Sequence, residues 1–339
     1  MGGVGKYIAT RLAVTPPMIL ILLTFVFFAL RVMPGDPVLA MLGGHNIPPE
    51  RIEEYRVKLG LDKPLYAQYF HYLGNIFRGD FGKSTRTGKP VLEDILARFP
   101  ATLELAVFGM AIAILIGLTT GTFAAIRSDR PVDHGIRIFN IGSFATPIFW
   151  LGLMLQIIFA VKLKVLPVAG RLDPKIGAFF RPITKFYVLD AILKKDLGLL
   201  IDALKHLAMP AFVLGLVLSG FIGRISRSSM LEVIDKEYVT TARSKGLTER
   251  AVNYKHALRN ALIPIVTVMG LQFALLMAGA ILTETTFSWP GIARYLVRSI
   301  EARDYYAIQG AVVWIAVLIS TVNLIVDVIY SFLDPRVRY

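Results

Sequence analysis

The run in this sequence that most resembles a chemical motif is Gly82-Lys83-Ser84. A run of this kind ends the phosphate-binding loop of nucleotide hydrolases, where the lysine and backbone N–H groups hold the phosphates. That loop also requires a glycine five residues before Gly82, and the residue at that position is Phe77. The sequence therefore predicts no nucleotide site at this run.

Side chains that could bind a metal or act as a nucleophile are scattered along the chain. The five histidines include no pair at the spacing of adjacent helical turns, and there is no cysteine, so neither a zinc site nor thiol chemistry is indicated. No Gly-x-Ser-x-Gly motif marks the nucleophile of a hydrolase. We therefore predict no catalytic residue, no metal and no cofactor in this chain, and we expect that it is not an enzyme.

Three carboxylates, Glu104, Glu284 and Asp327, fall in or beside strongly apolar segments. A charge inside a membrane span is costly and often functional. Each of these lies within about two helical turns of a segment end, where hydrogen bonds between helices suffice to hold it. We interpret them as structural groups, because a proton-coupled carrier would need a charged relay near the middle of the membrane.

The segments that must position these groups are long and apolar. Hydrophobic residues make up 55% of the chain and the mean hydropathy is +0.60, which is outside the usual range of globular proteins. A bilayer core about 30 Å thick requires roughly 20 apolar residues per spanning helix. Six runs meet that requirement: residues 12–30, 101–126, 136–161, 207–225, 263–282 and 308–332. We predict an all-α integral membrane protein with about six transmembrane helices.

The first run does not have the form of a cleaved signal peptide. Lys6 and Arg11 give it a basic start, but its apolar stretch is too long and no small-x-small cleavage site follows. We therefore expect it to remain as a span. In the second run, Gly117 and Gly121 form a small-xxx-small pair, which predicts close helix packing there.

Charge near the span ends predicts the orientation. Six spans place both termini on one side, and basic stretches there favour the cytoplasm. These stretches contain Lys6, Arg11, Arg127, Arg130, Arg336 and Arg338, and residues 224–259 hold eight Lys/Arg against four Asp/Glu. The net charge of +13 does not indicate nucleic-acid binding, because it is spread over both sides and no nucleic-acid-binding motif is present. Attraction to anionic membrane lipid explains much of the inner charge.

Two long segments are predicted to lie outside. In residues 32–100, a helix opens at Pro48 and Pro49 and ends at Gly60, and residues 61–77 form a second amphipathic helix. The glycines at 79 and 82 break that second helix. Residues 162–206 are interrupted by glycines and prolines, which favours an ordered loop over a domain.

The inner segment 226–262 is predicted to form a helix, a tight turn and a second helix. Residues 237–245 form the first helix, which Gly246 ends, and Thr248 is placed to cap the second. Four residues of the first helix recur at helical spacing and predict one shared face: Tyr238, Thr241, Ala242 and Lys245.

Two interpretations of this face remain open on the residues alone. Small residues beside an aromatic and a cation suit insertion into a groove of a partner protein. The alternative is an amphipathic helix that lies on lipid headgroups, although the face lacks the large apolar side chains which that role requires.

The same elbow resembles a known family. Residues 237–247 (EYVTTARSKGL) and 256–264 (HALRNALIP) are similar to the dipeptide and oligopeptide permease family of ABC importers, in particular the first of its two permease subunits, the dipeptide-permease B type. Further matching segments cover essentially the whole chain: Met33-Pro34-Gly35-Asp36-Pro37, Gly79-Asp80-Phe81-Gly82-Lys83-Ser84, Leu166-Pro167-Val168-Ala169-Gly170-Arg171, Ala278-Gly279-Ala280-Ile281-Leu282-Thr283-Glu284-Thr285, Phe287-Ser288-Trp289-Pro290-Gly291 and Asp334-Pro335-Arg336.

The resemblance implies a type I ABC importer permease fold in the cytoplasmic membrane of a bacterium or archaeon. It implies ATP-driven import of di- and oligopeptides, with this chain forming half of the pathway. The implied partners are a second, similar permease subunit, two cytoplasmic ATPases that carry the ATP and magnesium, and an extracytoplasmic peptide-binding protein. The elbow corresponds to the coupling helix that docks on an ATPase, and its implied docking residues are Tyr238, Thr240, Thr241, Ala242, Lys245 and Gly246.

The chain departs from the general pattern of such importers at one point. They carry Glu-Ala-Ala ahead of a glycine, whereas Thr240, Thr241 and Ala242 precede Gly246 here. The spacing from Gly246 to Pro264 is also longer than in the general pattern. Both departures resemble the peptide branch of the family, and no role of the missing glutamate is carried over.

The resulting domain organisation has three parts. Residues 1–100 hold the first span and an extracytoplasmic helical segment, residues 101–332 form the permease core, and residues 333–339 are a cytoplasmic tail. The core contains the coupling loop 226–262 and the outer loop 162–206. Similar machinery carrying nickel chelates or glutathione is the main alternative, and a secondary carrier or channel and a membrane-anchored scaffold or receptor are the rival classes.

Overall fold

The computed structural model describes residues 3–32, 38–39, 48–58 and 60–333. Every regular secondary-structure element in these ranges is a helix, which confirms the all-α prediction. The resemblance segments at residues 33–37 and 334–336, the tail 333–339 beyond Leu333 and the side chain of Asp327 lie outside the part described.

Five helices of the described chain are long and apolar enough to cross a membrane, and a bent helix pair makes a sixth candidate. The five are α1 (Gly3–Val32), α5 (Val91–Ile126), α10 (Leu197–Ile234), α13 (Leu258–Gly279) and α16 (Tyr305–Leu333). The pair consists of α6 (Pro131–Ala145) and α7 (Ile148–Leu155), and α7 continues into the π-helical turn η1 (Gln156–Lys162). The number of candidate spans, five or six, agrees with the prediction of about six transmembrane helices.

The third predicted span, residues 136–161, is not one straight helix. It breaks between α6 and α7, which meet at an angle of 96°. Pro147 has no backbone N–H and its ring disfavours a helical conformation for the residue before it, and Thr146 is extended, with a ψ of 125°. The residues on both sides of this bend are apolar, so the length of the apolar run did not reveal the bend between α6 and α7.

Helices α5 and α10 are longer than their predicted apolar runs. They contain 36 and 38 residues, so each is over 50 Å long at about 1.5 Å per residue. The extra turns are amphipathic and fall outside a count of apolar residues. At its later end α10 therefore carries the chain beyond the apolar run toward the inner elbow.

Glycines allow α5 and α10 to pack closely. A Cβ atom on Gly117 would come within 2.8 Å of Ile222 Cβ, and one on Gly121 would overlap the carbonyl oxygen of Gly223. The small-xxx-small pair in the second span therefore marks a real close contact, as predicted. These two helices and their neighbours form the main hydrophobic core.

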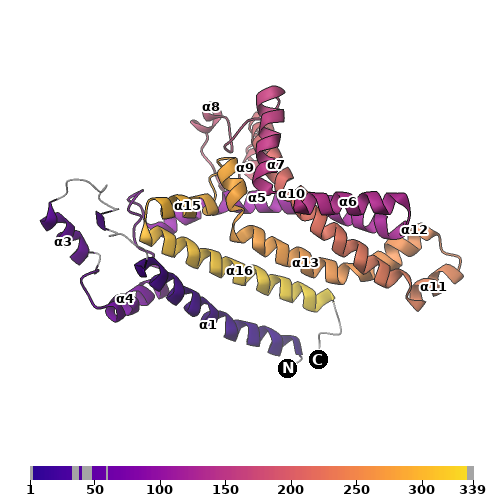
Figure 1. Cartoon of the computed structure of the whole chain (residues 1–339), viewed down its shortest axis with the longest axis horizontal. Coiled ribbons are helices and arrows are strands. Elements are labelled where there is room, and N and C mark those ends of the chain that lie inside the picture. The colour runs from indigo at the N-terminus through magenta and orange to yellow at the C-terminus, as the bar shows by residue number, and fades with distance from the viewer. Residues whose placement is uncertain (1–2, 33–37, 40–47, 59, 334–339) are drawn as a thin grey trace.

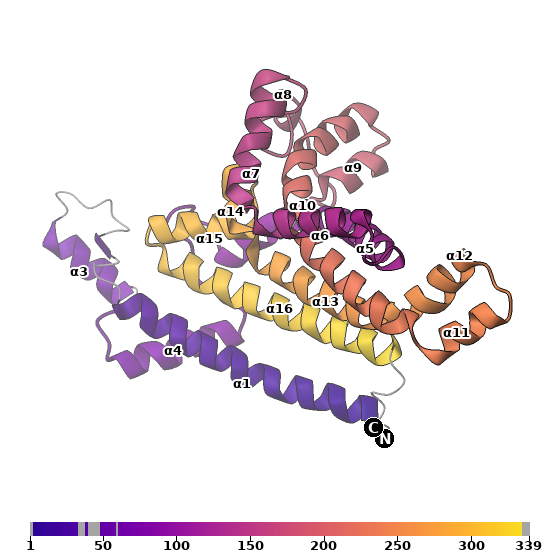
Figure 2. The same cartoon turned by 45° about the vertical axis from the view of Figure 1, so that its right-hand side comes forward.

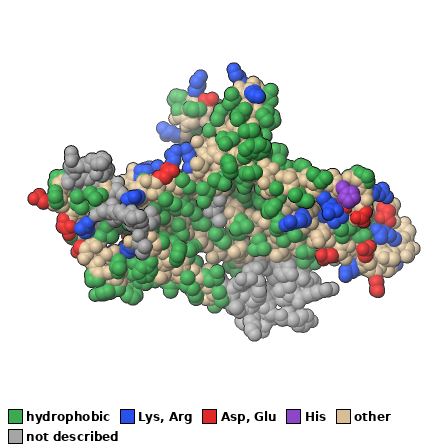
Figure 3. Space-filling model, viewed as in Figure 1, with side chains coloured by type: hydrophobic (Ala, Val, Ile, Leu, Met, Phe, Trp, Pro, Cys, Tyr) green, Lys and Arg blue, Asp and Glu red, His purple; other side chains and the backbone are tan. Residues whose placement is uncertain are grey.

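The helices are arranged side by side in a bundle (Figures 1 and 2). Helix α1 packs on α16, α16 on α13, and α13 on α5 and α10, while α6 lies against the other side of α10. The Gly3 end of α1 and the Leu333 end of α16 lie toward the same end of the bundle as the elbow. In Figure 3 charged side chains gather mainly at the two ends and on the projecting α7–α9 region, and hydrophobic side chains cover much of the surface between.

Short helices connect the long ones. They are α3 (Pro49–Lys58), α4 (Leu65–Phe77), α8 (Pro174–Gly177), α9 (Tyr187–Leu193), α14 (Ile281–Thr286) and α15 (Ile292–Glu301). Helix α4 begins four residues later than predicted, because Pro64 stands at its N-cap. Gly60, Gly79 and Gly82 have positive φ angles of 65°, 77° and 75°, as expected of glycines that end or break helices.

Candidate functional site

The elbow at residues 226–262 has the predicted helix–turn–helix form. Helix α11 (Glu237–Ser244) ends at Gly246, whose φ of +77° lets the chain turn back without a Cβ clash. The Thr248 hydroxyl then accepts a hydrogen bond from the backbone N–H of Ala251 and caps α12 (Glu249–Ala251). Arg243 Nε donates to Glu249 Oε1 at 3.1 Å across the turn.

The chain continues from α12 through the π-helical turn η2 (Val252–Ala257) into α13. Val239 of α11 is fully buried, as are Val252 and Ala257 of η2, and all three belong to the main core. The elbow is therefore packed onto the two spans that flank it. A displacement of α11 must be transmitted to α10 and α13, because close-packed interiors deform little.

The predicted face of α11 is divided by the fold. Tyr238, Thr241 and Lys245 are exposed, but Ala242 is only 6% exposed and packs in the core with Val239. Ala242 therefore lies on the core side of the helix, and the other three residues of the predicted stripe form its exposed side. Helical spacing shows which residues share a stripe, but not whether the stripe faces solvent or the core. Ala242 lies at the edge of the stripe, where the helix meets the core.

The other predicted docking residues are on the surface. Thr240 and Gly246 are exposed, together with the three exposed members of the predicted face. The structure adds two large side chains that the sequence reasoning missed: Leu247 is 42% exposed and Tyr254 is 50% exposed. Leu247 directly follows Gly246. An apolar residue immediately after the turn was therefore the sequence feature that could have indicated an exposed contact residue there. Tyr254 lies in η2, where the π-helical turn alters the simple helical spacing.

A buried ion pair fixes residues 162–206 to α5. Arg171 Nη2 donates to Glu104 Oε2 at 2.5 Å, and the backbone N–H of Val188 donates to Glu104 Oε1 at 2.8 Å. The Arg171 guanidinium also lies 3.6 Å from the ring centroid of Tyr187. Glu104 therefore joins two parts of residues 162–206 to a candidate span, in agreement with its interpretation as a structural group.

Glu284 has a similar structural role at the start of α15. Its carboxylate accepts hydrogen bonds from Thr102 Oγ1 at 2.7 Å and from the backbone N–H of Arg294 at 2.9 Å, and the Ile292 N–H donates to Thr102 Oγ1 at 2.8 Å. A Cβ at Gly291 would overlap this carboxylate. Glu284 is fully buried, and burial raises its pKa to about 7, against the opposing effect of these hydrogen bonds.

We use the name outer lobe for residues 162–206, the segment predicted to lie outside, which includes the short helices α8 and α9. The lobe is basic because it holds nine Lys and Arg against four Asp and no Glu. All four aspartates accept backbone N–H bonds: Asp173 from Lys175, Asp190 from Thr184 and its neighbours, Asp196 from Leu199, and Asp202 from Asp173. The exposed cations are Lys162, Lys164, Lys175, Arg181, Lys185, Lys194, Lys195 and Lys205. Figure 3 shows Lys and Arg side chains at the top of this projecting region.

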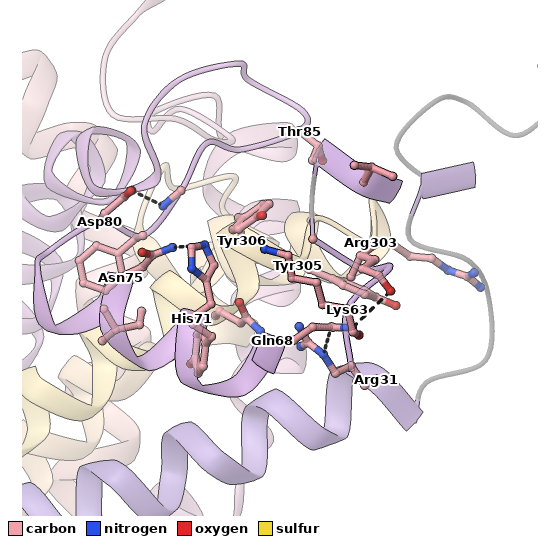
Figure 4. Close-up of a pocket in the computed structure, with 18 residues that line it drawn as sticks. Arg31, Lys63, Gln68, His71, Asn75, Asp80, Thr85, Arg303, Tyr305 and Tyr306 are labelled. Carbon is pink, nitrogen blue, oxygen red and sulfur yellow. Dashed lines mark hydrogen bonds between the residues drawn. The ribbon is translucent and has the colours of Figure 1, made fainter. Parts of the chain in front are cut away.

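A cavity of about 200 Å³ lies between α1, α4 and the start of α16 (Figure 4). Arg31 Nε donates to Gln68 Oε1 at 3.0 Å, and Gln68 Nε2 donates to the carbonyl of Lys63 at 2.8 Å. The Tyr69 hydroxyl is 2.6 Å from Thr24 Oγ1. These bonds attach the outer helix α4 to the end of the first span, so this cavity belongs to a structural joint. In the described chain, no cluster of three or more His, Cys, Asp or Glu is placed to hold a metal ion.

Comparisons with known families match nearly the entire chain. The family described as binding-protein-dependent transport system inner membrane component matches residues 113–339, and the family for the N-terminal part of that membrane component matches residues 5–106. The first of these matches alone covers more than half of the chain.

Curated proteins of similar sequence are permease subunits. The chain is 43% identical over 334 residues to the di/tripeptide transport system permease protein DppB of Pseudomonas aeruginosa (strain UCBPP-PA14), covering 98% of this chain and 99% of that protein. It is 42% identical over 337 residues to the dipeptide transport system permease protein DppB of Escherichia coli (strain K12), with the same coverage. The glutathione transport system permease protein GsiC of Escherichia coli O1:K1 / APEC is 35% identical over 334 residues, again 98% of this chain and 99% of that protein.

Proposed function

The chain belongs to the family of binding-protein-dependent transport system inner membrane components, and from this we propose that it is a permease subunit of an ATP-driven importer of dipeptides and short oligopeptides. The observation that carries the proposal is the full-length similarity to two DppB permeases at 42–43% identity. Membership of this family implies a substrate-binding protein and an ATPase as partners.

The subunit composition is a finer part of the proposal. We propose a second, similar permease subunit, two cytoplasmic ATPases and an extracytoplasmic peptide-binding protein. This chain is then a non-catalytic subunit, and ATP and magnesium are bound by the ATPases. Five or six candidate spans in one chain and the exposed apolar side chains of α6 and α7 are in keeping with half of a pathway that a second permease completes.

The exposed side of α11 is our proposed ATPase-docking surface, with the elbow and both termini in the cytoplasm. Tyr238, Thr241 and Lys245 lie on it, and Leu247 and Tyr254 add apolar area beside them. Ala242 and Val239 contribute from beneath by holding α11 on the core. If the groove on the ATPase binds α11 differently in its two nucleotide states, the elbow conveys that difference to α10 and α13.

The outer lobe is our proposed contact for the binding protein. Its eight exposed cations attract an acidic surface, which raises the rate of encounter and orients the partner. The Glu104–Arg171 pair holds the lobe on the bundle, so a bound protein contacts a surface that is fixed to a span.

The test is reconstitution in liposomes with the ATPases, the second permease and the binding protein of the same system. ATP-dependent accumulation of a labelled dipeptide supports the proposal. Uptake by this chain alone, without ATPases, would indicate a secondary carrier, and assembly without substrate-stimulated ATP hydrolysis would indicate a scaffold.

A second cargo is favoured by one specific observation. The glutathione permease GsiC is 35% identical to this chain over almost its full length. Glutathione is itself a modified tripeptide, so competition between labelled dipeptide and unlabelled glutathione in the same liposomes separates the two cargos. Stronger competition by glutathione than by unlabelled dipeptide would reverse our assignment.

A further inference from the structure

Helix α4 contains no Asp, Glu, Lys or Arg between Leu65 and Phe77, and it has three distinct sides. One side packs in a hydrophobic cluster with α1 and α16, through Tyr69, Tyr72, Leu73 and Ile76. A second, polar side lines the cavity of about 200 Å³ at the joint, through Gln68, His71 and Asn75. These two sides account for the contacts of α4 with the bundle, so the third side requires a separate explanation.

The third side of α4 is a line of exposed aromatic residues, which we call the aromatic stripe. It consists of Tyr66, Phe70 and Phe77, whose spacings of four and seven residues place them on one line along a helix. Their side chains are 69%, 67% and 77% exposed. Exposed apolar patches of this kind mark a contact with a membrane or with another protein.

The position of α4 along α1 indicates a membrane. The candidate span in α1 ends at Arg31. The Tyr69 hydroxyl is 2.6 Å from Thr24 Oγ1, and the ring centroids of Tyr69 and Phe28 are 6.2 Å apart. Thr24 and Phe28 precede Arg31 by seven and three residues, so these contacts lie roughly 5–10 Å inside the end of the span at about 1.5 Å per residue. Helices that lie in a membrane interface bury their apolar face to a similar depth of about 5–10 Å.

Exposed apolar surface continues from the span onto the aromatic stripe. Phe25 and Phe28 of α1 are both exposed within the candidate span, where such side chains face lipid. Phe28 stacks on Tyr69, and the Tyr69 ring centroid is 5.7 Å from that of Phe70. The stripe is therefore an extension of the lipid-facing surface of α1.

Two observations favour lipid over a partner protein. Helices α1 and α4 lie along the edge of the bundle opposite α6 and α7, whose exposed apolar side chains we relate to the second permease (Figures 1 and 2). The nearest exposed cations, Lys63 and Arg78, stand just beyond the two ends of α4. An uncharged aromatic helix with cations at its ends suits a membrane interface, whereas the basic outer lobe suits a soluble partner.

We propose that α4 is an interfacial helix, with its aromatic stripe inserted among the lipid chains of the leaflet on the side away from the elbow. The polar side of α4 then faces the cavity, and Lys63 and Arg78 lie at the level of the lipid phosphates. Residues 61–77 were predicted to lie outside the membrane, and this inference places part of them within the leaflet. It requires that α1 spans the membrane, and it does not depend on the cargo.

A spin label on a single new thiol locates the stripe, because the chain has no cysteine. Phe70→Cys places the label on the stripe, and His71→Cys, the next residue but on the polar side of the same helix, is the matched control. Phe25→Cys in the candidate span gives the reference for lipid, and Arg51→Cys in α3 gives the reference for water. All four variants are measured in the assembled transporter in nanodiscs.

The measurement is the ratio of two collision rates of the label, with oxygen and with a water-soluble nickel complex. Oxygen partitions into lipid, whereas the polar complex is excluded from it. The ratio at Phe70→Cys should be close to that at Phe25→Cys and at least about tenfold higher than that at Arg51→Cys. The ratio at His71→Cys should be lower than at Phe70→Cys.

Two results would overturn the inference. A nickel collision rate at Phe70→Cys as high as at Arg51→Cys would place the stripe in water. Low collision rates with both reagents at Phe70→Cys would show that a protein covers it. The proposed function stands in either case if the same complexes import dipeptide, and it fails separately if the unaltered transporter imports none.

A second position and a second readout guard against a variant that does not assemble. Phe77→Cys lies on the same stripe and should give the same collision pattern as Phe70→Cys. A fluorescent label on either thiol should be quenched by lipids with brominated acyl chains, and more strongly than the same label at His71→Cys. Equal quenching on the two sides of α4 would contradict the inference.

Discussion

Glu284 shows at the scale of one residue how burial and hydrogen bonding compete. Its pKa of about 7 exceeds the usual value of 4.5, because burial outweighs the hydrogen bonds from Thr102 and Arg294. Between those values the folded protein holds a proton that the unfolded chain releases. Stability should therefore fall as pH rises from about 4.5 to 7 and should level off above that range.

Thermal unfolding of the purified chain between pH 4.5 and 8 measures this dependence. Glu284→Gln cannot titrate, so its decline over the same range should be shallower by about 2–5 °C. Equal pH dependence in the two proteins would show that Glu284 does not carry a raised pKa.

The Glu104–Arg171 pair makes a second prediction at this scale. Arg171→Met leaves a buried carboxylate without its cation, which in buried pairs costs about 3–5 kcal/mol. The outer lobe should then open locally, and limited proteolysis should cut residues 172–196 faster. Adding Glu104→Gln removes the unpaired charge and should restore much of the protection. Unchanged cleavage in Arg171→Met would mean that the pair does not hold the lobe.

Some features of single residues at the elbow were predictable from the sequence and others were not. The turn at Gly246 and the cap at Thr248 were predictable because each depends on local backbone geometry. The inward direction of Ala242 was not, since helical spacing gives the faces of a helix but not which face meets the core. A charge at Ala242 would therefore disturb packing, whereas Tyr238 and Thr241 report on docking alone.

At the scale of elements, glycines bring α5 and α10 into close contact. Gly121→Ala would force a Cβ against Gly223 and Ser226, and such overpacking typically costs about 1–3 kcal/mol. Gly135→Ala in α6 is the control, because nothing lies within 4 Å of its added Cβ. Alanine there should be neutral or stabilising by up to about 1 kcal/mol. Thermal unfolding of both variants tests the contact, and equal effects would argue against it.

The number of spans was predictable from the sequence, but the shape of the third was not. A hydropathy run counts apolar residues and carries no information on direction. Pro147 was the only local sign of the 96° bend between α6 and α7, and proline within a membrane helix often produces only a kink.

At the scale of the whole molecule, the two proposed partners contact separate regions of one bundle. The exposed elbow is at one end, and the basic outer lobe projects from the middle (Figures 1 and 2). The spans and the elbow follow from the residues themselves. The identities of the partners and of the cargo come from family membership and from the relatives, because a groove or an acidic surface on another protein leaves no direct trace in this sequence.

The basic outer lobe predicts a strong dependence of binding-protein association on salt. Lys175→Glu, Arg181→Glu and Lys205→Glu together should slow association about tenfold or more at low ionic strength, and raising the salt should narrow that difference. The corresponding Gln substitutions should have an intermediate effect. Surface plasmon resonance on the nanodisc-embedded complex gives the rates. Association that is insensitive to both charge and salt would remove the lobe from the binding site.

The central claim is that the exposed side of α11 transmits ATPase motion to the spans. Its most direct test is the ATP-driven dipeptide uptake of the reconstituted complex carrying Thr241→Glu, with the neutral Thr241→Gln as a control for the change in side-chain size at the same position. We predict that the Thr241→Glu bundle stays folded, while ATPase association weakens and uptake falls at least tenfold, equivalent to about 1.4 kcal/mol. Normal ATPase association together with normal uptake in Thr241→Glu would contradict the account.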